Sequence, residues 1–407
     1  MTSRVSIIKA PDYEPARVLD RMRECLVPLG GMGAFVRPGA KVLIKPNLLG
    51  AFAVEKAVTT HPSVIRAAIL LAQEAGGKIL VGDSPGVGSL GWVARACGVL
   101  PVLEETGAGL ADFKAIQEFE NPDNVVAKKL VLARAAAEAD VIISLPKLKT
   151  HGQLAFTGAL KNQYGLVPGT LKCQWHFRLQ DRNWLAALML DIHRTVQPDL
   201  AIMDAIIGME GQGPSGGSPR QIGALLAGSD LAAVDTLACF LIGLDPRFVP
   251  ILEAVRKQRA GAVSLNEIEV VGEDWQQLRV ADFKKVTDLT DVLSVIPLPR
   301  SVLQWIRSQW TARPRIDPSK CNQCGICENY CPVSPSAIHP AAAARPKVED
   351  KACIRCYCCH EFCPSHAIEL RYSWLSRTFR GQALSDKAGQ LVSKVWPWRR
   401  RTNARQD

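Results

Sequence analysis

Two copies of one cysteine spacing constrain this 407-residue chain more than any other feature of its sequence. Each copy reads C-x-x-C-x-x-C-x-x-x-C-P, and the second copy begins 32 residues after the first. Together they contain Cys321, Cys324, Cys327, Cys331, Cys353, Cys356, Cys359 and Cys363. The chain has 13 cysteines in all, an odd number, and its first residues do not form a secretory signal. We therefore expect metal-bound thiolates in a reducing, cytoplasmic compartment rather than a disulfide framework.

The spacing also predicts which metal centre these thiolates bind. Three thiolates at intervals of three residues on a tight loop can ligate three irons of one cubane cluster, while the trailing cysteine ligates the other cluster. Two [4Fe–4S] clusters are therefore expected. Cluster 1 takes Cys321, Cys324, Cys327 and Cys363, and cluster 2 takes Cys353, Cys356, Cys359 and Cys331. Zinc is the alternative, but structural zinc sites usually place pairs of cysteines on either side of a longer spacer.

Residues 317–371 resemble the bacterial two-cluster ferredoxins, which implies a small α+β ferredoxin-like module. The resemblance includes an Ala-Ile pair after each Cys-Pro, at Ala337-Ile338 and Ala367-Ile368. A two-residue insertion after the first Cys-Pro departs from the pattern but removes no ligand. Cys358 is interpreted as a bystander beside a ligand. The scattered cysteines are expected to behave as small buried hydrophobes; they are Cys25, Cys97, Cys173 and Cys239.

The first 295 residues alternate between short apolar runs and helical patterns. The apolar runs predict strands at 41–44, 78–81, 140–145, 199–203, 221–227 and 268–271. The helical patterns cover residues 62–75, 181–195 and 231–241. This alternation predicts an α/β domain at 1–295 with a mostly parallel sheet and helices on both faces. A linker with a short amphipathic helix is expected at 296–316, and a basic tail at 372–407.

Polar side chains follow several of the predicted strands, where ligands of parallel α/β sheets bind. The candidates for catalysis or ligand binding are Lys45, His61, Asp83, Lys147, Lys149, His151, Lys161 and Asp204. Lys147, Lys149 and Lys161 have no carboxylate near them in sequence, which suits an anionic ligand. A basic surface loop is the alternative, and His61 can instead cap the helix that begins at Pro62. The five glycines of 208–217 are a weak signal for a phosphate-type loop.

The same domain resembles the family called domain of unknown function 362. The resemblance rests on blocks that occur in order along residues 5–295: Lys45-Pro-Asn-Leu48, Thr59-Thr-His-Pro62, Val81-Gly-Asp-Ser-Pro85, Leu145-Pro-Lys-Leu-Lys-Thr-His151, Ala159-Leu-Lys-Asn162, Gly211-Gln-Gly-Pro214 and Ala233-Val-Asp-Thr236. Members of this family often occur fused to ferredoxin-type modules. The resemblance therefore implies a fold and a domain arrangement, but it assigns no reaction.

Three functions are consistent with these patterns. In the first, the clusters pass electrons to or from a redox partner protein or a small anionic substrate at the α/β domain, as part of an oxidoreductase. In the second, the clusters are structural or sense redox state, and the α/β domain binds a ligand without converting it. In the third, the α/β domain is a non-redox enzyme in which His151 and Asp204 act as acid and base.

The net charge of +10 is unevenly distributed, and this argues against nucleic-acid binding. Residues 371–407 contain nine Lys or Arg against two Asp, so the rest of the chain is close to neutral. Trp374, Trp396 and Trp398 alternate with arginines in this tail. Such a segment suits peripheral contact with an anionic membrane surface, and a solvated disordered tail is the alternative.

Overall fold

The computed structural model describes residues 2–169, 171–179, 181–286, 312–339 and 347–371. Its contacts divide the chain into two compact units. The first unit contains residues 1–286, here called the α/β domain, together with residues 314–369, here called the cysteine module. Nearly all of the second unit, and with it the predicted linker helix and basic tail, lies outside the described residues. The domain boundaries predicted from the sequence stay predictions.

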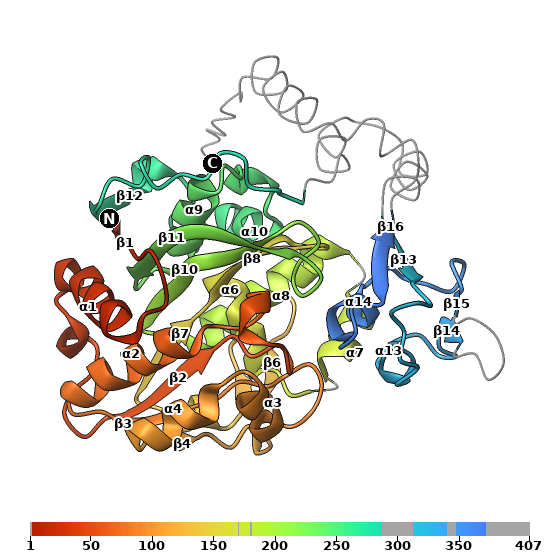
Figure 1. The fold of residues 1–407 in the computed structure, drawn as a ribbon, viewed down its shortest axis with the longest axis horizontal. Helices are drawn as coiled ribbons and strands as arrows, with labels where there is room; N and C mark the ends of the chain where they lie inside the picture. Colours follow the sequence, from red (N-terminus) through yellow and green to blue (C-terminus); the bar gives the residue numbers. More distant parts are fainter. Residues whose placement is uncertain (1, 170, 180, 287–311, 340–346, 372–407) are drawn as a thin grey trace, which may run out of the picture. The chain divides into compact units, whose positions relative to one another are not determined.

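A ten-stranded sheet forms the centre of the α/β domain (Figure 1). Eight of its strands follow the order β12-β1-β11-β10-β7-β2-β3-β4, and β8 joins β10 to β9. The strands are β1 (Ser3–Lys9), β2 (Lys41–Pro46), β3 (Lys78–Val81), β4 (Gly109–Leu110), β7 (Val141–Leu145), β8 (Lys147–His151), β9 (Ala155–Thr157), β10 (Leu200–Glu210), β11 (Ser218–Gly228) and β12 (Ile268–Gly272). Most neighbouring pairs are parallel, including β2 with β3 and β7.

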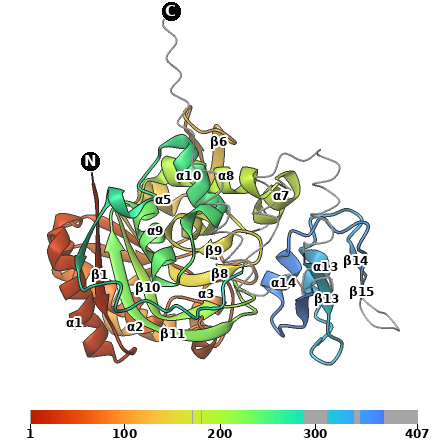
Figure 2. The ribbon, with the colours of Figure 1, turned by 90° about the horizontal axis from the view of Figure 1, so that it is seen from above.

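Helices cover both faces of this sheet because successive strand residues point to opposite sides. In β2, Leu43 enters one apolar core and Ile44 enters the other. One face packs against α1 (Pro15–Leu26), α2 (Pro62–Glu74), α3 (Leu90–Ala96) and α4 (Val99–Thr106). The other packs against α6 (Ala159–Asn162), α8 (Arg182–Val196), α9 (Leu231–Leu241) and α10 (Pro250–Gln258). Figure 2 shows α1 and α9 on opposite sides of β1, β10 and β11.

The predicted α/β class is confirmed, and three neighbouring strand pairs of the sheet are antiparallel: β1 with β11, β8 with β9, and β10 with β11. All six predicted strands and all three predicted helices are present, with ends shifted by a few residues. However, β10 and β11 form an antiparallel hairpin. The reason is the short connection Gly211–Gly217, because a parallel crossover needs a dozen or more residues. The remaining elements of the domain are β5 (Ile116–Glu120), β6 (Lys129–Ala133), α5 (Ala135–Glu138) and α7 (Leu171–Arg178).

The cysteine module is a small α+β structure, as its resemblance implies. Its strands pair in two short ladders, β13 (Arg313–Ile316) with β16 (Ile368–Arg371) and β14 (Ile338–His339) with β15 (Lys347–Val348). Its helices are α13 (Ile326–Asn329) and α14 (Cys358–Phe362), one in each cysteine repeat. Among the described residues, no helix has the length and hydrophobicity needed to cross a membrane.

Candidate functional site

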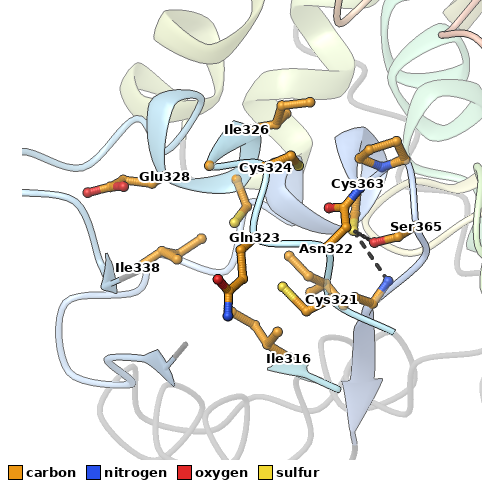
Figure 3. A pocket seen from close by; sticks show the side chains of 15 residues that line it. Ile316, Cys321, Asn322, Gln323, Cys324, Ile326, Glu328, Ile338, Cys363 and Ser365 are labelled. Atoms are coloured by element: carbon orange, nitrogen blue, oxygen red, sulfur yellow. Dashed lines mark hydrogen bonds between the residues drawn. The ribbon is translucent and has the colours of Figure 1, made fainter. Parts of the chain in front are cut away.

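The eight repeat cysteines line two separate cavities in the cysteine module. A cavity of about 240 Å³ is bordered by Cys321, Cys324, Cys327 and Cys363 (Figure 3). A smaller cavity of about 20 Å³ is bordered by Cys331, Cys353, Cys356 and Cys359. Each set takes three cysteines from one repeat and the trailing cysteine from the other. The two sets coincide with the ligand sets predicted for cluster 1 and cluster 2.

The arrangement of these thiols fits an iron–sulfur cluster better than a single metal ion. In the described part of the chain, no three Cys, His, Asp or Glu side chains lie close enough together to hold one ion. A cubane cluster holds its thiolates further apart than a zinc ion does, because each thiolate binds a different iron. Burial raises the pKa of the Cys327 thiol to about 11, and bound iron would oppose this by stabilising the thiolate. The module also supplies backbone donors, since the amide of Ala367 lies 3.3 Å from Cys363 Sγ.

In the α/β domain, the ends of β2 and β3 bring Lys45 and Asp83 together. Lys45 Nζ donates to Asp83 Oδ1 at 2.8 Å, and both side chains are buried. Asp83 Oδ2 accepts a hydrogen bond of 2.7 Å from the amide of Leu48. Asn162 joins the pair, because its Oδ1 accepts from Lys45 Nζ at 3.3 Å. Burial lowers the pKa of Lys45, while Asp83 raises it.

A second buried network contains three more of the sequence candidates. Lys147 Nζ donates to Asp204 Oδ2 at 2.8 Å and to the hydroxyl of Tyr13 at 2.7 Å. Asp204 also accepts from the Tyr13 hydroxyl and from the amide of His61. The His61 ring stacks on Tyr13 and accepts from the amide of Ser63, so it caps α2. Burial lowers the pKa of His61 to about 4, so the ring is neutral at pH 7.

The expectation that the three lysines after the third predicted strand lack nearby carboxylates is wrong for Lys147. The strand order explains this, because β8 lies beside β10, which carries Asp204. Among the described residues, no carboxylate pairs with Lys149, which donates instead to Asn47 Oδ1 at 2.9 Å and to the carbonyl of Val58 at 2.7 Å. Burial therefore lowers its pKa well below the ordinary value.

Side chains of the cysteine module reach the remaining candidates, His151 and Lys161. His151 Nδ1 accepts from the amides of Gln153 and Leu154, so in the neutral ring the proton is on Nε2. That nitrogen lies 2.9 Å from Oε1 of Glu361, a residue of α14. Burial lowers the pKa of His151 to about 4. His151 and Lys161 together hold the pKa of the Glu361 carboxyl well below its usual range.

The glycine-rich loop after β10 contacts the cysteine module instead of lining an open ligand site. Ser215 Oγ donates to the carbonyl of Glu361 at 3.1 Å. His360 Nε2 lies 3.2 Å from the carbonyl of Gln212, and the His360 ring fills the space beside Gly216. In the loop after β3, there is no room for a side chain at Gly86, because the Phe362 ring lies against it.

A cavity of about 50 Å³ remains where these elements meet, and we call it the crevice cavity. Its charged or polar lining includes Asp83, Ser84, Lys161, Lys172, His176 and Glu361. Lys172 Nζ donates to the carbonyl of Ser84, and burial lowers the pKa of Lys172 to about 8. Lys172, His176 and Glu361 were not candidates in the sequence. No local pattern could identify them, because Glu361 meets His151 across 210 residues of chain.

Two further carboxylates near the strand ends have structural roles. Asp230 accepts from the amides of Ala232 and Ala233 and so caps α9. Asp235 accepts from the amides of Ala159 and Leu160 at the start of α6. The candidate residues therefore do not converge on one point: Lys45 and Asp83 form one pair, Lys147, Asp204 and His61 form a second network, and Lys161 lines the crevice cavity, while Lys149 and His151 lie outside its lining.

Comparisons with known proteins agree with this two-part arrangement. The family described as "Domain of unknown function (DUF362)" matches residues 42–240, and a "4Fe-4S binding domain" matches residues 313–338. The thylakoid-associated protein sll1697 of Synechocystis sp. is 40% identical over 255 residues, which cover 62% of this chain and 79% of that protein.

Among solved structures, the lactate racemase apoprotein of Thermoanaerobacterium thermosaccharolyticum is similar with a TM-score of 0.38 and 14% identity. The similarity covers 60% of this chain and 58% of that one, so this chain spans less than two thirds of the neighbour's length. A similarity at this level carries no argument about ligand or activity.

Proposed function

Because this chain belongs to the domain of unknown function 362 family and carries a 4Fe-4S binding domain, we propose that it holds two [4Fe–4S] clusters and transfers electrons to or from a substrate or partner at its α/β domain. The eight repeat cysteines supply the ligands, with the trailing cysteines exchanged between the two clusters. The clusters supply one-electron chemistry when bound.

The observation that supports this proposal is the position of α14. Cys359, a predicted ligand of cluster 2, lines the second cysteine cavity, while Glu361 lines the crevice cavity. Residues two apart on a helix point about 200° apart, so these side chains leave opposite sides of one helical turn. A single turn thus separates the cluster 2 ligands from the crevice of the α/β domain, which suits electron transfer between them.

Iron and acid-labile sulfide counts on anaerobically purified full-length protein test this proposal. We expect eight irons per chain and an EPR signal from reduced clusters. Addition of a substrate or partner should then reoxidise the reduced clusters. A preparation with no iron would overturn the cluster assignment, and clusters that never change redox state would favour the binding or sensing alternative.

The non-redox alternative assigns acid–base roles to His151 and Asp204. The contacts of these residues do not favour it, because His151 Nδ1 accepts two backbone amides and Asp204 already accepts from Lys147 and Tyr13. Replacing both Cys353 and Cys356 by serine tests this alternative directly. Turnover that survives the loss of cluster 2 would support it.

A peripheral membrane location is a separate proposal. The 40% identical relative is described as a thylakoid-associated protein, and the basic Trp-rich tail of this chain suits an anionic lipid surface. Co-sedimentation with anionic liposomes, with and without residues 372–407, tests it. Equal recovery of both proteins with the liposomes would show that residues 372–407 do not bind the membrane.

A further inference from the structure

The crevice cavity and the two buried networks beside it together carry more positive than negative formal charge. Five lysines lie in this region: the buried Lys45, Lys147, Lys149 and Lys172, and the half-buried Lys161. The carboxylates that face them are Asp83, Asp204 and Glu361. Even with a neutral Lys149, these lysines and carboxylates among themselves leave one positive charge uncompensated. A buried charge without a partner is costly, so an anion bound here would be favoured.

Two side chains that line the cavity can form hydrogen bonds in addition to those seen in the structure. Lys161 is attracted to Glu361, Cys358 and Asp83, but within the described ranges its ammonium donates no hydrogen bond. His176 is 6% exposed, and its Nδ1 has no partner among the described residues. Burial lowers the pKa of His176 to about 4, so at pH 7 it is a neutral ring with one N–H donor.

We infer that the crevice cavity binds a small carboxylate anion through Lys161, Lys172 and His176. A volume of about 50 Å³ accommodates a group of the size of formate or acetate, since one water needs roughly 10–15 Å³ on this measure. Glu361 keeps its contact with His151 when the anion binds, and it borders the cavity on the side of the cysteine module. The site is therefore complete only when both parts of the chain contribute to it.

The lining favours a carboxylate over a phosphate. None of the residues that border the cavity is an arginine, the side chain that grips phosphate with two parallel bonds. In addition, the carboxylate of Glu361 is already held in these surroundings by His151 and Lys161. The inference that an anion binds depends only on the cavity. If this anion is also the substrate, that role depends on the proposed electron-transfer function.

Isothermal titration of anaerobic, iron-loaded full-length protein with sodium formate and sodium acetate tests this inference, with ionic strength held constant by chloride. We expect saturable binding of one anion per chain. Lys161→Met and His176→Leu should each weaken it by about tenfold or more, as expected for lost bonds to a charged group. Lys161→Arg keeps the charge and should retain most of the affinity. Lys285→Met is the matched control, because it removes a half-buried lysine that donates to the carbonyl of Gly243 outside this cavity.

The outcomes separate this inference from the proposed function. If wild-type protein with eight irons binds neither formate nor acetate saturably, the inference is overturned and the cluster proposal stands. Inorganic phosphate binding more tightly than both carboxylates would also overturn it, as would equal affinities of Lys161→Met and Lys285→Met proteins. If anaerobically purified protein contains no iron, yet binds formate and loses this binding on Lys161→Met substitution, the inference stands and the cluster proposal fails.

Discussion

In the first cysteine repeat, Cys324 is exposed and α13 has no buried residue, whereas in the second repeat all five residues of α14 are buried. The two repeats nevertheless share one cysteine spacing. Equivalent positions show the contrast directly. Asn329 and Glu361 each lie two residues before the trailing cysteine, yet Asn329 is exposed and Glu361 meets His151 in the crevice.

The difference shows that ligand spacing and protein contacts are separate properties of the module. The spacing brings three thiols of each repeat to one cysteine cavity, and it is the same in both repeats. The residues between the cysteines decide which repeat packs against the α/β domain. We therefore expect the two clusters to differ in solvent exposure and in hydrogen bonding, which are the factors that tune cluster potentials.

Loss of a cluster ligand should have the largest effect, and an unequal one. Cys327→Ser and Cys359→Ser change equivalent ligands, and each should remove about half of the bound iron. Cys359→Ser should also lower the melting temperature by about 5 °C more, because α14 packs against the crevice. Iron counts and anaerobic calorimetry on both variants measure this. Equal losses of stability would mean that the contacts of α14 add nothing.

The aromatic residue before each trailing cysteine offers a second comparison. Phe362→Ala removes a buried ring that lies against Gly86, and we expect it to cost about 3–5 kcal/mol of stability. Tyr330→Ala removes a half-buried ring and should cost about 1 kcal/mol. Urea unfolding of iron-loaded protein gives both values. A larger loss for Tyr330→Ala would contradict the unequal packing of the repeats.

Acid should destabilise the crevice. Burial lowers the pKa of His151 and of His176 to about 4, below the value of about 6.5 for an exposed histidine. Their contribution to stability is therefore complete above pH 6.5 and is lost as the pH falls toward 4. Each histidine contributes up to about 3 kcal/mol. Melting temperatures measured across this range should fall, and the fall should be shallower in the His151→Gln, His176→Gln double variant.

The smallest expected effect concerns the carboxylate itself. Glu361→Gln keeps the shape of the side chain but removes the charge that faces His151 and Lys161, which should cost about 1–3 kcal/mol. Asn329→Ala, at the equivalent exposed position, should change stability by less than about 0.5 kcal/mol. Chemical unfolding of both variants measures these changes. If Glu361→Gln leaves the free energy of unfolding unchanged, the contact of Glu361 with His151 does not stabilise the protein.

Much of the fold follows from patterns that are local in the sequence. Apolar runs of four to six residues predict β2, β3 and β7, and a Pro at the first turn with Gly after the last predicts α2. The antiparallel β10–β11 hairpin was missed because pairing direction depends on the path of the connecting loop as well as on the strands. Of the charged residues that line the crevice cavity, the sequence supplied Asp83 and Lys161, but only as members of an unordered set of polar positions.

The sequence by itself predicted the composition of the two cysteine sets, because three of the four thiols in each set lie at a short, fixed spacing on one tight loop. Only the tertiary structure decided which charges meet. It paired Lys147 with Asp204 across neighbouring strands and placed Glu361 of the second repeat beside His151. It also buried Lys172 and His176 at the same cavity. Burial and partnership arise from contacts between distant segments, and no periodicity within either segment encodes them.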